Sequence, residues 1–257
     1  MKRKGKVKVL NNPTMEKLDG LKLVGMLKAF REQEGMPEIG SLSFEERFGL
    51  MLDREAMERD NRKLKSRLKK AKLKLNACVE DIDYSHRRGL DKSVMAQLIS
   101  CKWVRDKNNV IIIGPTGTGK SYLAEALANN ACREGFDAML ERFPKLMKEL
   151  EIAENDGRYS RLMKAIAKTA LLVIDDFGLD TLTPRQRRNL LEVLEDRYNV
   201  RSIIVTSQFP VDKWHGIIGD PTLADAILDR LVHNSYKITL KGDSMRKTKR
   251  NLTENDR

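Results

Sequence analysis

Short apolar runs alternate with amphipathic segments along the chain from residue 110 onward. Apolar runs at 110–113, 170–174 and 202–206 predict buried strands, and shorter runs around 137–142 and 236–240 predict two more. Between them, apolar residues recur at helical spacing over 121–133, 145–154, 159–168, 184–198 and 221–233. Strands that alternate with helices in this way predict an α/β fold, in which a parallel sheet lies between helices on both faces.

The first hundred residues have a helical pattern throughout. Apolar residues at steps of three predict an amphipathic helix over 15–33, which Gly35, Pro37 and Gly40 end. Ser43 and Glu46 have the spacing of a capping box and predict the start of a long helix. We therefore expect a small all-α domain over 1–78 and an α/β domain over 79–257. The second domain includes a linker over 81–89 and a short basic tail over 242–257.

The loop after the strand at 110–113 carries a pattern with specific chemistry. It fits the spacing Gly-x-x-x-x-Gly-Lys-Ser of a P-loop, between a strand and a helix as that motif requires. Its glycines let successive N–H groups point at a polyphosphate, Lys120 adds a charge, and the Ser121 hydroxyl is placed to bind Mg²⁺. The pattern predicts that the protein binds a nucleoside triphosphate, and the alternative is a glycine-rich turn. The predicted nucleotide contacts are Gly114, Pro115, Thr116, Gly117, Thr118, Gly119, Lys120, Ser121 and Tyr122.

Two acidic residues end the apolar strand at 170–174. An apolar strand followed by a carboxylate is the Walker B arrangement, so Asp175 is the expected Mg²⁺ ligand, and Asp176 is placed to orient the attacking water. In the alternative interpretation, the two aspartates only cap the end of a strand. Ligands of such sheets bind at the carboxyl ends of the strands, where Gly114, Asp175 and Gln208 fall. Ile82 and Tyr84 of the linker either lie against the base or simply pack.

Charge is distributed unevenly along the chain, whose net charge is +12. Residues 1–100 carry 23 basic and 15 acidic side chains, residues 101–229 carry 18 and 19, and residues 230–257 carry 8 and 3. A basic excess at both ends favours nucleic acid as a partner. It is densest over 59–74, where nine residues are basic and one is acidic. The predicted DNA contacts there are Arg59, Arg62, Lys63, Lys65, Arg67, Lys69, Lys70, Lys72 and Lys74.

The composition narrows the kind of nucleic acid and excludes several classes of site. Aromatic residues are scarce at 5%, so contact with duplex phosphates is favoured over stacking on single-stranded bases. The alternative for the basic segment is a solvated or packed helix face. Three widely spaced cysteines and three scattered histidines argue against a disulfide framework or a zinc site. Because no apolar run approaches about 20 residues, we expect a soluble, cytoplasmic protein that does not span a membrane.

Together these motifs resemble the AAA+ ATPases of the DnaA/DnaC initiator and loader group, and within it the IstB-like transposition helpers of bacterial insertion sequences. The resemblance covers essentially the whole chain and rests on the segments at 60–65, 171–178, 204–208 and 242–246, together with the P-loop. It implies a five-stranded AAA+ core behind a helical DNA-binding domain. It also implies assembly into a ring or a helical filament and ATP-dependent capture of double-stranded target DNA for a partner transposase.

The resemblance also implies roles for individual residues. Lys120 and Ser121 bind phosphate and Mg²⁺, and Asp175 is the Walker B metal ligand. Asp176 stands where most AAA+ proteins have Glu, and its side chain is shorter by about 1.5 Å, which implies hydrolysis that is slow or depends on assembly, DNA or a partner. Three further catalytic or sensing positions follow from the resemblance: Gln208 as the sensor after the fourth strand, Arg230 as the arginine finger and Arg246 as a second sensor. The alternative for Arg230 is a salt bridge with Asp229 or Asp225.

Three other functions share some of these motifs. A replicative helicase loader of the DnaC type would have nearly all of them but would handle single strands and a helicase. A small-molecule P-loop kinase would need phosphate-clamping arginines between the second and third strands, where the sequence predicts an ordinary helical hairpin. The last alternative is a structural DNA-binding subunit whose nucleotide site is inactive.

Overall fold

The computed structural model describes residues 13–85 and 88–245, which divide into two compact units. The first ends at Ser66 and the second begins at Arg67, twelve residues before the boundary that we expected at 78. The reason lies in contacts that follow residue 66. The Arg67 Nε donates to the Cys132 carbonyl at 2.8 Å, and the N–H groups of Lys74 and Leu75 donate to Glu125. Residues 67–78 therefore belong with the α/β unit.

The first unit contains helices α1 (Pro13–Gly20) and α2 (Val24–Glu34), the 3-10 turn η1 (Ile39–Ser41) and the start of α3 (Phe44–Ala71). The helix that we predicted over 15–33 is thus two helices. Helix α1 stops because Lys22 takes a φ of 58°, and Leu23 N–H bonds back to the Leu18 carbonyl at 2.9 Å, as in a Schellman motif. As a consequence Leu21 is 69% exposed, although helical spacing placed it on the apolar face.

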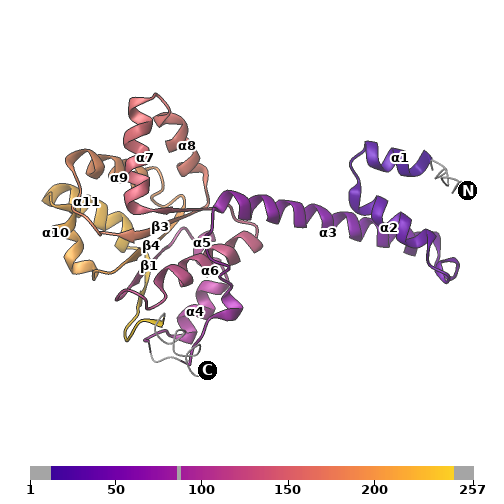
Figure 1. Ribbon diagram of the computed structural model, residues 1–257, viewed down its shortest axis with the longest axis horizontal. Coiled ribbons are helices and arrows are strands. Elements are labelled where there is room, and N and C mark those ends of the chain that lie inside the picture. The colour runs from indigo at the N-terminus through magenta and orange to yellow at the C-terminus, as the bar shows by residue number, and fades with distance from the viewer. Residues whose placement is uncertain (1–12, 86–87, 246–257) are drawn as a thin grey trace, which may run out of the picture. The chain divides into compact units, whose positions relative to one another are not determined.

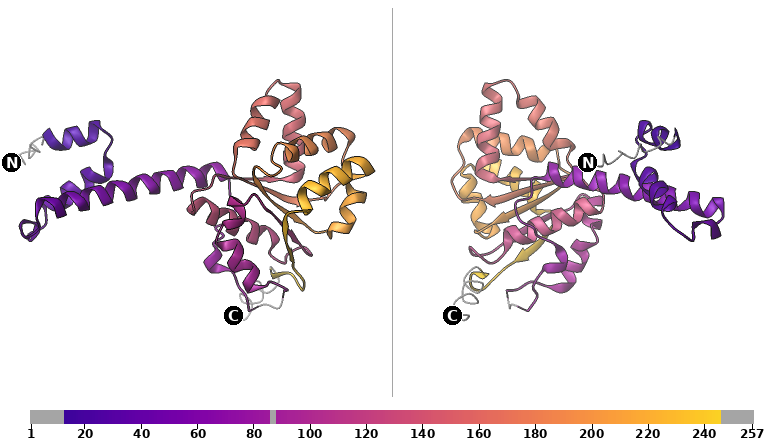
Figure 2. Two further views of the ribbon diagram at one scale, coloured as in Figure 1. Left: turned by 180° about the vertical axis from the view of Figure 1, so that it is seen from behind. Right: turned by 45° about the vertical axis from the view of Figure 1, so that its right-hand side comes forward.

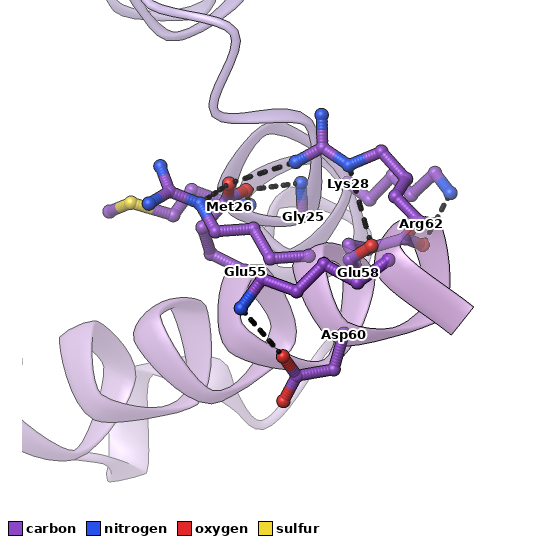
Figure 3. Close-up of polar contacts among 9 residues, drawn as sticks. Gly25, Met26, Lys28, Glu55, Glu58, Asp60 and Arg62 are labelled. Carbon is purple, nitrogen blue, oxygen red and sulfur yellow. Dashed lines mark hydrogen bonds and ion pairs between the residues drawn. The ribbon is translucent and has the colours of Figure 1, made fainter. Parts of the chain in front are cut away.

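Helices α2 and α3 are held together by a buried carboxylate. Glu55 Oε2 accepts the N–H groups of Gly25 at 2.7 Å and Met26 at 3.3 Å, as Figure 3 shows. It takes the place of an N-cap, because the cap residue of α2, Leu23, supplies no side-chain acceptor. A Cβ on Gly25 would lie 2.5 Å from the Arg54 carbonyl oxygen, so only glycine permits this close approach.

Helix α3 begins at the predicted capping box. The Ser43 N–H donates to Glu46 Oε2 at 2.7 Å, and the Glu46 N–H donates to Ser43 Oγ at 3.2 Å. The hydrogen bonds that Ser43 donates to the Glu46 carboxylate lower the pKa of Glu46. The predicted long helix is confirmed, and it runs for 28 residues.

The second unit is built on a five-stranded sheet in the order β2-β3-β4-β1-β5, and all of its neighbouring strands are parallel. Helices cover both faces of the sheet (Figures 1 and 2), which confirms the predicted AAA+ P-loop architecture. Helix α6 contacts one face, with α4 packed against it, and α7 and α11 contact the sheet from the other side. The strands are β1 (Asn109–Ile113), β2 (Ala138–Arg142), β3 (Leu171–Phe177), β4 (Ser202–Ser207) and β5 (Ser235–Thr239). The longer helices are α4 (Lys92–Ile99), α6 (Lys120–Arg133), α7 (Phe143–Asn155), α8 (Tyr159–Lys168), α9 (Pro184–Glu195) and α11 (Pro221–Val232).

Short elements complete this unit at places where the sequence pattern predicted none. Helices α5 (Lys102–Arg105) and α10 (Trp214–Ile218) and the 3-10 turns η2 (Val79–Asp81) and η3 (Val211–Lys213) are each three to five residues long. Trp214, in α10, is fully buried, and its ring centroid lies 4.6 Å from that of Phe177 at the end of β3. Within the described residues, no helix is long and apolar enough to cross a membrane.

Candidate functional site

The P-loop connects the end of β1 to the start of α6, as predicted. Gly117 and Gly119 have φ values of 86° and 95°, which side chains rarely adopt, so the loop requires glycine there. Lys120 is only 7% exposed, and its Nζ donates to the Pro115 carbonyl at 3.0 Å. The Lys120 side chain therefore curls back over the loop, where a phosphate group would lie.

A cavity of about 650 Å³ opens beside the P-loop. This volume is within the usual range for a site that binds a cofactor-sized ligand. Its lining includes P-loop residues, a residue near the end of β3, the residue that follows β4, and a group that precedes α4. The lining residues are Leu75, Asn76, Asp81, Asp83, Arg88, Thr116, Gly117, Gly119, Lys120, Ser121, Tyr122, Asp176, Gln208 and Met245.

The linker contributes to this cavity, but through other residues than Ile82 and Tyr84. Asp81 and Asp83 line it, whereas Ile82 is buried and the Tyr84 ring lies under the Lys92 ammonium group at 5.5 Å. Ile82 and Tyr84 therefore pack within the protein, as the second of the two interpretations expects, and do not line the cavity.

The expected metal ligands lie side by side. Ser121 Oγ donates to Asp175 Oδ1 at 2.9 Å, and Thr206 Oγ1 donates to the same oxygen at 2.5 Å. A hydroxyl and one buried carboxylate next to a phosphate site form the set that Mg²⁺ uses, since this ion takes few protein ligands and completes its shell with phosphate and water. The residues present therefore fit Mg²⁺, which would be held by Ser121 and Asp175 and would neutralise phosphate charge.

A β-bulge separates the two aspartates. Ile174 pairs with Val205 and Phe177 with Ser207, so Asp175 and Asp176 together oppose the single residue Thr206. Asp176 has a φ of 61°, and its N–H donates to Thr206 Oγ1 at 3.0 Å. In a regular strand consecutive side chains point to opposite faces, and the bulge breaks this alternation. It allows Asp176 to line the cavity directly after the buried Asp175.

Asp176 is engaged by an arginine that the sequence did not single out. Arg142, the last residue of β2, donates a hydrogen bond from Nε to Asp176 Oδ2 at 3.0 Å, and its Nη2 forms an ion pair with the same oxygen at 2.9 Å. The strand order explains the contact, because β2 and β3 are neighbours and Arg142 pairs with Asp175 in register. The carboxylate that we expect to orient water is therefore held by a cation.

Gln208 reaches the cavity from the end of β4. Its Oε1 accepts a hydrogen bond from Thr116 Oγ1 of the P-loop at 2.8 Å. A sensor in this position would contact the loop that surrounds the phosphates. The predicted second sensor, Arg246, lies outside the described residues.

Arg230 lies far from the P-loop of its own chain. Its carbonyl accepts a hydrogen bond from the side chain of Asn109, which begins β1, whereas the P-loop follows the other end of that strand, roughly 16 Å away. The Arg230 guanidinium pairs with Glu195 at 2.9 Å, and not with Asp229 or Asp225 as the alternative had it. The Arg230 guanidinium therefore lies away from the P-loop of its own chain.

The nine basic residues over 59–74 fall into two groups. Five of them are used inside the protein: Arg59 and Arg62 pair with Glu55, Lys63 with Asp60, Lys72 with Glu141, and Arg67 donates to the Cys132 carbonyl. Figure 3 shows the cluster around Glu55. Burial would raise the pKa of Glu55, but hydrogen bonds from Arg59, Gly25 and Met26 outweigh it and lower the pKa.

The other four basic residues over 59–74 are not engaged in this way. Within the part of the chain that the structure describes, Lys65, Lys69, Lys70 and Lys74 make no ion pair or side-chain hydrogen bond, and all four are exposed. These four lysines therefore differ from the other five in having no partner among the described residues.

Sequence reasoning missed several residues of the site. Arg142, Thr206, Arg88, Leu75 and Asn76 belong to no motif, and each reaches the nucleotide site through pairing or packing with segments distant in the chain. Only Thr206 had a local signal, as a polar residue near the end of an apolar strand.

Comparison with known proteins identifies the family. Residues 16–253 match the family model described as IstB-like ATP binding protein. The chain is 48% identical over 242 residues to an insertion sequence ATP-binding protein of Sinorhizobium fredii, y4pL, covering 94% of this chain and 99% of that one. It is 33% identical over 205 residues to the ATP-binding protein of insertion sequence IS21 from Pseudomonas aeruginosa, covering 80% of this chain and 77% of that one.

Solved structures share the fold at lower identity. DnaI superposes with a TM-score of 0.56 at 20% identity, over 64% of this chain and 91% of that one. The DnaC helicase loader gives a TM-score of 0.55 at 18% identity, over 65% and 97% of the two chains. The P-loop geometry, the sheet order and the family match agree: the chain belongs to the family of IstB-like ATP-binding proteins and is an AAA+ ATPase associated with transposition.

Proposed function

We propose that this ATPase binds double-stranded DNA in an ATP-dependent manner, assembles on target DNA as a ring or helical oligomer, and recruits or activates a transposase. Its relatives are named as ATP-binding proteins of insertion sequences, which supports a role beside the transposase of such an element. The net charge of +12 and the exposed lysines of α3 support a polyanionic partner.

One observation carries the link between ATP and DNA: the basic end of α3 continues directly into the wall of the nucleotide cavity. The N–H groups of Lys74 and Leu75 donate to Glu125 Oε2 at 2.6 and 2.7 Å, and Leu75 and Asn76 line the cavity. Glu125 is buried on α6, the helix that the P-loop begins. A nucleotide that packs against Leu75 orders the segment that carries Lys74, so each ligand would strengthen binding of the other.

The chemistry at the site follows from its residues. The P-loop N–H groups and Lys120 hold the polyphosphate, and Ser121 and Asp175 hold Mg²⁺, which neutralises phosphate charge. Asp176 orients the attacking water once its carboxylate is released from Arg142, and Gln208 contacts the phosphate loop through Thr116. ATP turnover is slow as long as Arg142 remains paired with the Asp176 carboxylate.

Assembly would complete the site. Arg230 lies at the opposite end of β1 from the P-loop, so its charge can act only on the triphosphate of a neighbouring subunit. A heterologous contact of this kind repeats from subunit to subunit and produces rings or helical filaments. ATP would then be hydrolysed mainly within the oligomer, where a trans-acting arginine stabilises the transition state.

The test is a binding titration with the full chain. Fluorescent duplex and single-stranded DNA of equal length are titrated at several salt concentrations, with and without a non-hydrolysable ATP analogue. We expect tighter binding to the duplex, a gain of about fivefold or more with the analogue, and loss of that gain in Lys120→Ala.

Two results would contradict the proposal. Tighter binding to the single strand would favour a helicase loader, the function of the DnaC protein that shares the fold. ATP turnover that does not exceed that of Lys120→Ala, with or without DNA, would point to a structural DNA-binding subunit. Negative-stain images of the duplex complex with the analogue would show whether rings or filaments form.

A further inference from the structure

A buried arginine lies behind the P-loop. Arg88 is 5% exposed, lines the nucleotide cavity and belongs to the linker that precedes α4. Its Nη1 donates to the Thr118 carbonyl at 3.1 Å and contacts Met245 Sδ at 2.8 Å, and its Nη2 donates to the Asp83 carbonyl at 3.0 Å. The Arg88 guanidinium thus joins the linker, the P-loop and the segment after β5.

The P-loop is shaped around this side chain. A Cβ on Gly119 would lie 2.6 Å from Arg88 Nη1, so the loop leaves room for the guanidinium as well as for phosphate. Main-chain hydrogen bonds join the same three segments. The Lys241 N–H donates to the Arg88 carbonyl at 2.8 Å, and the Met245 N–H donates to the Gly117 carbonyl at 3.0 Å. A change at Arg88 therefore alters the turn at Thr118 and Gly119.

The charge of Arg88 is only partly compensated within the protein. Among the described residues no carboxylate forms an ion pair with it, and its Nε is buried without a hydrogen-bond partner. Burial lowers the pKa of Arg88, while the charges of Asp83, Tyr84 and Tyr122 raise it. A buried cation that lacks an anionic partner is costly, and a ligand that brings negative charge beside it removes that cost.

We propose that Arg88 is a positioning residue of the nucleotide site, which holds the Thr118–Gly119 turn in its phosphate-binding shape and supplies, behind Lys120, a second buried cation for the polyphosphate. The inference rests on the nucleotide site of the proposed function and not on its DNA partner. It assigns Arg88 to the recognition of phosphates, so its contribution rises with the number of phosphate groups.

A second buried arginine provides a matched control. Arg197 is fully buried and also donates to main-chain carbonyls, among them those of Ile166, Thr169 and Ser202. Ile166 lies near the end of α8, and Thr169 and Ser202 lie at the amino-terminal ends of β3 and β4, whereas the P-loop follows the carboxyl end of β1. Replacing Arg197 disturbs a buried guanidinium to a similar degree without touching the nucleotide cavity.

The experiment measures the affinities of the full chain for a non-hydrolysable ATP analogue, ADP and AMP, the last by competition. In Arg88→Gln we expect affinity for the analogue and for ADP to fall about tenfold or more, and affinity for AMP to fall less than about threefold. Arg88→Lys keeps the charge, but its single ammonium group cannot donate to the Thr118 and Asp83 carbonyls as the two guanidinium nitrogens do. We therefore expect an intermediate loss of affinity. Arg197→Lys leaves all three affinities within about twofold of the wild type.

Melting curves with and without the analogue show that each variant is folded, and Arg88→Lys replaces Arg88→Gln if the latter is not. An equal loss for AMP and the ATP analogue, or an equal loss in the Arg197 control, would overturn the inference. DNA binding is measured in parallel. If duplex affinity does not respond to the analogue while the dependence on phosphate number holds, the proposed function fails and the role of Arg88 stands.

Discussion

Arg142 forms an ion pair with a single carboxylate oxygen of Asp176: its Nε donates a hydrogen bond at 3.0 Å, and its Nη2 lies 2.9 Å from the same oxygen. The pair connects the ends of β2 and β3 at the edge of the nucleotide cavity. Asp176 takes part from a backbone of positive φ, which the bulge against Thr206 creates. The residue expected to orient water is thus held away from that task by a partner on the neighbouring strand.

Removing Arg142 is expected to raise basal ATP turnover. In Arg142→Ala the Asp176 carboxylate is released into the cavity, and we expect turnover without DNA to rise about three- to tenfold, since a positioned base contributes more than this in full. Steady-state phosphate release measures it. Arg158→Ala, which breaks the exposed pair with Asp156, is the control and leaves turnover unchanged. A drop in turnover would show that Arg142 supports the site, and Asp176→Asn should abolish any gain.

The two groups of basic residues on α3 are expected to respond differently to neutralisation. Replacing Lys65, Lys69 and Lys70 together by Gln removes charges without internal partners. The salt dependence of duplex affinity should then flatten by roughly 0.9 for each phosphate that is no longer neutralised. Replacing Arg59 and Arg62 by Gln should change the slope little, because both pair with Glu55. Equal slopes for the lysine variant and the wild type would place the phosphate contacts elsewhere.

Glu55 is expected to stabilise the first unit in a pH-dependent way. Glu55→Ala leaves the N–H groups of Gly25 and Met26 without their acceptor and should lower the free energy of unfolding by about 1–3 kcal/mol at pH 7. The pKa of Glu55 in the folded chain lies below its ordinary value of 4.5. Its contribution is therefore complete above that value and is lost as the pH falls through the lower, folded pKa. Urea unfolding at pH 7 and pH 3 measures both, and a difference between wild type and variant that does not shrink from pH 7 to pH 3 would contradict this sign.

Arg230 is expected to act on a neighbouring subunit. Arg230→Ala should bind nucleotide normally and hydrolyse it slowly, and Lys120→Ala should not bind it. If the two variants are mixed in equal amounts, random assembly places an intact P-loop next to an intact Arg230 in about a quarter of the sites, and that share of turnover should return. A mixture no more active than its components would limit Arg230 to its ion pair with Glu195.

The elements of the α/β unit were largely predictable from the sequence because their causes are local. The apolar runs of the five strands and the P-loop spacing each act within a few residues, as does the capping box at Ser43 that begins α3 in the first unit. The break between α1 and α2 was missed, since Lys22 takes a left-handed conformation that is typical of glycine and no residue type there signals it.

The sequence by itself determined that the chain binds a triphosphate, because a P-loop places all of its chemistry on consecutive residues. Only the tertiary structure decided which distant side chains surround that site and which lie away from it. The pairing of Arg142 with Asp176, the contact of Arg88 with Thr118, and the position of Arg230 at the far end of β1 join residues that are 30 or more positions apart. Nine similar basic residues became two groups for the same reason, since an ion pair depends on which carboxylate the fold brings near each cation.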